Sequence, residues 1–94
     1  MSLDVYRLKN GKPDKLLLSI SDLEYRELLP AIDKFKLKTG LYIDLYKDLK
    51  LNSGLQALID VVDSTNNGKQ IYKSLLSILQ RSEIEDCGII FVGD

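Results

Sequence analysis

Tyrosine and aspartate side chains alternate along one short stretch of the chain, at Tyr42, Asp44, Tyr46 and Asp48. Carboxylates are ligands for divalent cations, and tyrosine rings stack on bases or partner side chains. In a strand, residues two apart lie about 6.5–7 Å from each other, which is wide for two carboxylates sharing one ion. A metal site therefore needs a bend that returns Asp48 to Asp44. Without it, these residues form a strand's outer face, whose tyrosines suit a protein interface.

A second set of candidate residues is Asp14, Asp48 and Lys50. Pro13-Asp14 followed by Asp48-Leu49-Lys50 resembles the PD…(D/E)xK signature of a large nuclease superfamily. The resemblance implies that the two acids hold Mg²⁺ and that the lysine positions the attacking water. Here the usual glutamate is replaced by aspartate in an expected turn, and the flanking helix-strand order is missing. The pattern predicts either a divalent-metal-dependent hydrolase or two solvent-facing turns.

Most other catalytic chemistries lack their residues in this chain. There is no histidine, and Cys87 is the single cysteine, so Ser-His and Cys-His pairs and Cys-rich zinc sites are excluded. Glu85 and Asp86 flank Cys87 and would raise the pKa of a thiol, which favours a packing role over a nucleophilic one. No phosphate-loop or dinucleotide motif occurs. We therefore expect a protein that is not an enzyme and needs no cofactor.

Residues 51–94 hold three Lys/Arg and six Asp/Glu, so this half is the acidic half of a chain whose net charge is −1. Five of these acids are candidate interaction residues. They lie near the ends of two expected helices, where carboxylates oppose the helix dipole. Such a patch would attract a basic protein partner; alternatively, the acids pair with the lysines of "KFKLK" or maintain solubility. The candidate acidic interaction residues are Asp60, Asp63, Glu83, Glu85 and Asp86.

These features favour a small, non-catalytic protein-interaction module. Bacterial immunity proteins, which are small acidic α+β domains that neutralise basic toxins, are an analogy in composition and fold class. The metal-dependent hydrolase and a homo-oligomeric small-ligand-binding domain are the alternatives; a homodimer would follow if Ile89–Val92 were a sheet edge. The sequence predicts a cytoplasmic location, no membrane association, and no strong attraction to nucleic acid.

The elements that position these residues follow from turns, caps and apolar spacing. Asn10-Gly11 predicts a hairpin turn. The capping box "SDLE" begins a helix at Ser21 that ends at Gly40 and kinks or splits at Pro30, near Leu29. Its expected buried stripe is Leu23, Leu28, Leu29, Ile32 and Phe35. Strict alternation then predicts a strand over Leu41–Leu45, with the odd side chains inward and a turn near Lys47-Asp48.

Two further helices and a last strand complete the chain. Asn52 or Ser53 is expected to cap the first, which buries Leu55, Leu58, Ile59 and Val62; the second, after Asn67-Gly68, buries Ile71, Tyr72, Leu75, Ile78 and Leu79. Ile89–Val92 is expected to be a strand that is central or covered on both faces. The order β-β-α-β-α-α-β over residues 1–94 predicts one α+β domain. It has a single mixed or antiparallel sheet of three or four strands, with about three helices mainly on one face.

Overall fold

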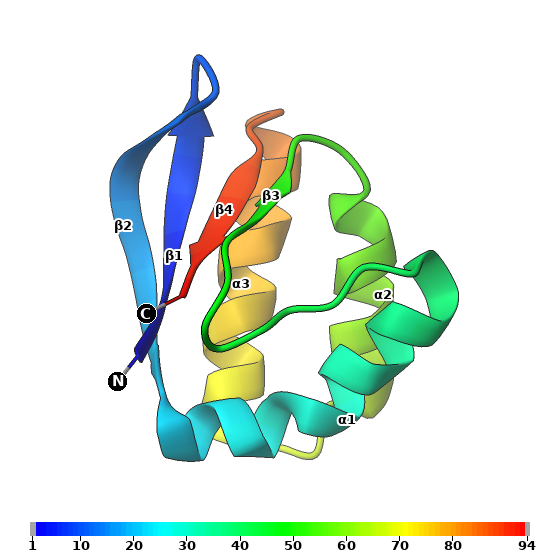
Figure 1. The fold of residues 1–94 in the computed structure, drawn as a ribbon. Coiled ribbons are helices and arrows are strands. Elements are labelled where there is room, and N and C mark those ends of the chain that lie inside the picture. The colour runs from blue at the N-terminus through cyan, green and yellow to red at the C-terminus, as the bar shows by residue number, and fades with distance from the viewer. Residues whose placement is uncertain (1, 94) are drawn as a thin grey trace.

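A four-stranded antiparallel sheet carries three helices on one face in the computed structural model, which describes residues 2–93 (Figure 1). The strands are β1 (Ser2–Lys9), β2 (Lys12–Ser21), β3 (Leu49–Leu51) and β4 (Ile89–Val92). The helices are α1 (Asp22–Thr39), α2 (Leu55–Thr65) and α3 (Gln70–Ile84). The predicted fold class and element order are confirmed. No helix in the described range is long and apolar enough to cross a membrane.

The last strand of the chain lies inside the sheet, whose order is β2-β1-β4-β3. Ile89 and Phe91 belong to the core, while Ile90 is also buried, at 4% exposure, between its register partners Tyr6 and Lys50. The central position, one of the two that the sequence predicts for this strand, is confirmed. Because β4 is interior, it is not the exposed edge that the homodimer hypothesis required.

The β1–β2 hairpin turns at Asn10-Gly11, as predicted. Both residues have positive φ angles, 55° and 77°, which is the backbone that a two-residue type I′ turn requires. The register shifts twice along the pair, between Val5 and Tyr6 and between Arg7 and Leu8. Such irregularities increase the local twist of a strand pair.

The α1 helix has the capping box that the sequence predicts. The Glu24 N–H donates to Ser21 Oγ at 3.2 Å, and the Ser21 N–H donates to Glu24 Oε1 at 3.0 Å. The helix ends at Gly40, whose φ is 79°. The expected split near Leu29 is wrong, because the helix continues through Pro30. Pro30 is exposed, so water can satisfy the carbonyl group that its missing N–H leaves free.

The buried side of α1 differs from the predicted stripe at its start. Leu23 is 68% exposed, whereas Tyr25 is 8% exposed and belongs to the buried core. Leu28, Ile32 and Phe35 are buried as expected. The helix buries a face that begins at Tyr25 because the tyrosine hydroxyl has a polar partner inside, which we describe below.

The α2–α3 hairpin buries most of the predicted residues. All four expected α2 side chains are buried, and Ile78 alone of the α3 set is only partly buried. The expected cap at Asn52 or Ser53 is wrong: Gly54 occupies the N-cap position with φ 80° and supplies no side chain. The Tyr72 hydroxyl donates to the Glu27 carbonyl at 2.7 Å and ties α3 to α1.

Two leucine substitutions in α1 distinguish the observed burial from the sequence pattern. Leu28→Ala should reduce the free energy of unfolding by about 2–5 kcal/mol because it leaves a cavity in the core. Leu23→Ala should change it by less than about 0.5 kcal/mol because this side chain is mostly in solvent. Urea unfolding of both variants measures the difference, and equal losses would contradict the orientation of α1.

Candidate functional site

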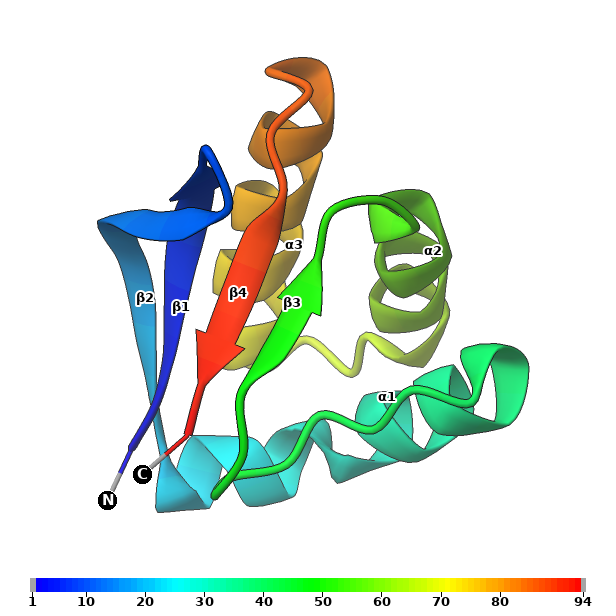
Figure 2. The ribbon, with the colours of Figure 1, turned by 45° about the horizontal axis from the view of Figure 1, so that its top comes forward.

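The stretch that carries Tyr42, Asp44, Tyr46 and Asp48 is a loop between α1 and β3. It returns along α1 towards the start of that helix before the chain turns into β3 (Figure 2). The predicted strand over Leu41–Leu45 is therefore wrong. The short β4 strand pairs with Leu49–Leu51 and leaves no ladder partner for the residues before them.

A turn at Asp44 shapes this loop. Asp44 Oδ1 accepts from the Tyr46 N–H at 2.9 Å, and the Lys47 N–H approaches the Asp44 carbonyl oxygen at 3.4 Å. Aspartate commonly makes this local contact in turns. The predicted turn thus occurs slightly earlier than Lys47-Asp48. Ile43 and Leu45 are buried as expected, but Leu41 is 40% exposed, contrary to prediction.

Tyr25 fixes the loop against α1. Its hydroxyl lies 2.6 Å from the Ile43 carbonyl oxygen, to which it donates, and 3.5 Å from the Tyr42 hydroxyl. Burial raises the pKa of Tyr25, and the neighbouring Tyr42 hydroxyl adds to this effect. The neutral phenol, which can donate to the loop, is therefore favoured. On the loop's outer side, Lys36 Nζ lies 5.1 Å from the centroid of the Tyr42 ring, within cation–π range.

Tyr42 and Tyr46 are exposed together at a surface hollow of about 430 Å³, which we call the tyrosine hollow. Its walls are the first half of α1 and the loop. It is lined by Asp22, Tyr25, Arg26, Leu29, Tyr42, Asp44, Leu45 and Tyr46. The alternating pattern identified three of the loop residues. It missed the α1 residues, because only the return of the loop along the helix brings them to the same place.

The two loop aspartates are engaged with different backbone groups. Asp44 accepts from Tyr46, whereas Asp48 Oδ1 accepts from the Gly93 N–H at 3.0 Å, at the end of β4. Between residues 2 and 93, no three His, Cys, Asp or Glu side chains form a group suited to a metal ion. Each carboxylate shapes the loop, and neither contact supports a shared cation.

The three residues of the hydrolase hypothesis also have separate partners. Arg7 binds Asp14, with Nε 3.0 Å from Oδ2, and this hydrogen bond lowers the pKa of Asp14. Lys50 Nζ donates to the Gly11 carbonyl oxygen at 3.1 Å, in the hairpin turn. Asp48 binds Gly93, as above. The hydrolase remains a prediction that these contacts do not support.

The acidic candidates do not form one surface. Asp60 and Asp63 lie on α2, towards the turn that joins it to α3, whereas Glu83, Glu85 and Asp86 lie at the far end of α3. The 15 residues of α3 span about 22 Å, and this length separates the two groups of acids. Asp60 Oδ2 is 4.0 Å from Lys38 Nζ on α1. Pairing with the α1 lysines, the alternative reading of these acids, therefore applies to Asp60.

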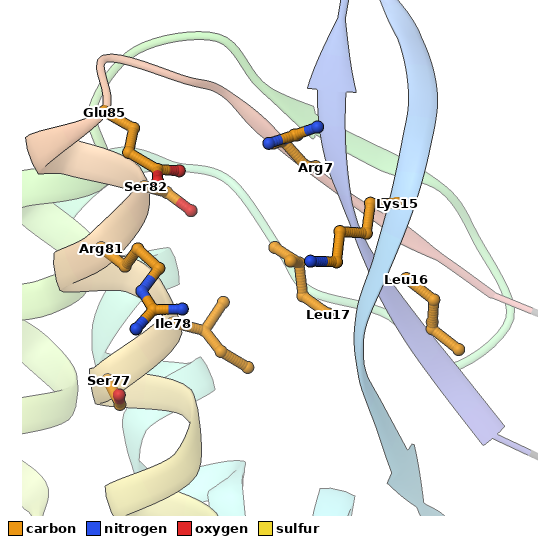
Figure 3. A pocket seen from close by; sticks show the side chains of 9 residues that line it. All are labelled: Arg7, Lys15, Leu16, Leu17, Ser77, Ile78, Arg81, Ser82 and Glu85. Atoms are coloured by element: carbon orange, nitrogen blue, oxygen red, sulfur yellow. The ribbon is translucent and has the colours of Figure 1, made fainter.

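A second hollow, of about 300 Å³, lies between α3 and the β1–β2 hairpin, and we call it the cationic groove (Figure 3). It is lined by Arg7, Lys15, Leu16, Leu17, Ser77, Ile78, Arg81, Ser82 and Glu85. Glu85 is the only one of these residues among the predicted interaction residues, and Ile78 is predicted as a core residue. Arg7 and Lys15 are partners across the β1–β2 hairpin, and the distant Arg81 joins them only because α3 packs beside the hairpin.

Comparisons with protein-family models, with curated proteins and with solved structures found no match to this chain.

Replacing Gly93 tests the contact between the loop and the end of β4. A Cβ atom at this position would overlap the Lys47 nitrogen and would lie 2.6 Å from the Tyr46 carbonyl carbon, both backbone atoms. Gly93→Ala should therefore reduce the free energy of unfolding by about 1–3 kcal/mol. Asp48→Ala removes only the hydrogen bond and should cost about 0.5–1.5 kcal/mol. A neutral Gly93→Ala variant in thermal unfolding would contradict this close approach.

Stability at high pH tests the Tyr25 contact. Folding raises the pKa of Tyr25 above its ordinary value of about 10, so its contribution is complete below that pH and is lost as pH rises further. Tyr25→Phe should lower stability at neutral pH by about 1–3 kcal/mol, because the Ile43 carbonyl loses its donor, and should flatten the decline above pH 10. The exposed Tyr46→Phe is the matched control. Parallel pH profiles for Tyr25→Phe and wild type would refute the assignment.

Proposed function

We propose that this chain is a small, non-catalytic protein-interaction module of the cytoplasm that binds a partner protein through the tyrosine hollow. The observation that carries the proposal is the joint exposure of Tyr42, at 39%, and Tyr46, at 59%, around one concave surface. Tyrosine provides a large contact area with few rotatable bonds, and it is enriched among the residues that dominate binding energy.

The hollow is supported by a loop with several fixed points. The Tyr25 hydroxyl holds the Ile43 carbonyl, the Asp44 side chain fixes the turn, and Asp48 binds the end of β4. A surface that already has its bound shape loses less conformational entropy on association. These contacts support recognition by a preformed surface.

Two carboxylates in the lining and the exposed tyrosine rings offer contacts for a basic group on the partner. Asp22 and Asp44 contribute two carboxylates to the lining, and Arg26 contributes one cation. Tyrosine faces attract cations, as Lys36 above the Tyr42 ring illustrates. A lysine or arginine side chain of the partner, placed between the rings and near the carboxylates, would satisfy both attractions. An inhibitor or immunity-type role against a basic protein agrees with this chemistry.

Affinity capture from the source cells with three matched variants tests the proposal. Tyr42→Ala combined with Tyr46→Ala should weaken binding of the captured partner at least about tenfold in a subsequent titration, since a hot-spot tyrosine contributes about 2 kcal/mol. Leu37→Ala, at a position that is 89% exposed and outside the hollow, should bind like wild type.

A charge-reversed variant separates the hollow from the dispersed acidic residues. Changing Asp60, Asp63, Glu83 and Glu85 to lysine should leave the partner bound if the hollow is the interface. Loss of binding in this variant, with retention in the double tyrosine variant, would overturn the assignment to the hollow. Capture of the same proteins with equal affinity by all variants would overturn it as well.

A further inference from the structure

We propose that the cationic groove between α3 and the β1–β2 hairpin binds a small organic oxyanion. Its carboxylate or phosphate group would lie between Lys15 and Arg81, and its apolar part would lie on Leu17 and Ile78. The site shares no residue with the tyrosine hollow, so the inference is independent of the proposed function.

The basic side chains converge on the groove from two elements. Lys15 extends from β2 towards α3, and Arg81 lies on α3 at the opposite wall of the groove (Figure 3). Neither forms an ion pair with any residue between 2 and 93. Both cations line the same groove, so an oxyanion between them would gain two charge-assisted contacts.

The remaining charges lie mainly at one end of the groove. Arg7 is occupied by Asp14, whose hydrogen bond and charge raise the pKa of the guanidinium. Glu85 lies near Arg7 and adds to that shift. With Asp14 included, three cations and two carboxylates surround the groove and give it a local charge of +1. The whole chain carries −1, so this groove is locally attractive to anions.

The lining also specifies the remainder of the ligand. Leu17 and Ile78 are partly buried and face the space between hairpin and helix, while Ser77 offers a hydroxyl group on the same side of α3 (Figure 3). A volume of about 300 Å³ is at the lower end of the range for ligand sites. These features select a compact anion with a short apolar group rather than a polyanion such as nucleic acid.

Titration of ¹⁵N-labelled protein, followed by NMR, tests the site with three named probes. Hexanoate supplies a carboxylate, butyl phosphate supplies a phosphate, and hexan-1-ol supplies the apolar chain without charge. We expect saturable shifts at the amides of Leu17, Ser77 and Ile78 with at least one anion, and binding of the alcohol at least about tenfold weaker. The stronger of the two anions identifies the headgroup.

Matched variants test whether the amide shifts depend on the charges of Lys15 and Arg81. Lys15→Gln and Arg81→Gln should each weaken the preferred anion at least about tenfold, since a charge-assisted contact is lost. Lys73→Gln, an exposed lysine of α3 outside the groove, should bind like wild type. Both groove positions are exposed, so the variants should keep the wild-type amide spectrum elsewhere. Equal affinities for alcohol and anions, unchanged binding by both groove variants, or shifts that do not saturate would overturn the proposal.

Discussion

The insertion of β4 between β1 and β3 is the constraint on which the rest of the structure depends. This strand has four residues, Ile89–Val92, and it alone connects the N-terminal hairpin to β3 within the described sheet. Ile89 and Phe91 enter the core from one face, while Ile90 is buried on the other. A continuous apolar run of this kind suits an interior position in a sheet, and β4 occupies it between β1 and β3.

The position of β4 also determines where the tyrosine loop runs. Asp48 binds the Gly93 N–H just beyond β4, and the loop backbone approaches Gly93 so closely that a Cβ atom would overlap it. At the other side, Tyr25 of α1 holds the Ile43 carbonyl. The loop is thus bound at one side to the end of the sheet and at the other side to α1, and Tyr42 and Tyr46 remain exposed.

The cationic groove has a different origin. It lies between the β1–β2 hairpin, which has two register shifts, and the C-terminal half of α3. The long side chains of Lys15 and Arg81 fill this space only partly and bring positive charge to a chain that is acidic overall. The ligands that we propose for the two hollows are therefore opposite in charge, a basic group for the tyrosine hollow and an oxyanion for the groove.

Local signals in the sequence predicted the turns and caps correctly where a single contact decides them. Asn10-Gly11, the Ser21–Glu24 capping box and Gly40 needed no tertiary information, because their hydrogen bonds and φ angles are local. Alternation over residues 41–45 predicted the burial of Ile43 and Leu45 correctly, but the paired strand that it also predicted is wrong. An extended chain alternates its side chains with or without a neighbour, whereas a ladder requires a partner strand with free hydrogen-bonding groups.

The sequence by itself determined the α+β class, the element order, the hairpin and most of the apolar core, since periodicity and turn chemistry encode these features. Only the tertiary structure decided which face of α1 is buried at its start, that Tyr42 and Tyr46 share one hollow with α1, and that Lys15 meets Arg81. The acidic residues of α2 and those at the end of α3 lie apart, because the length of α3 separates them. The physical reason is that contacts between distant residues depend on how the elements dock, and docking is set by the whole core rather than by any local spacing.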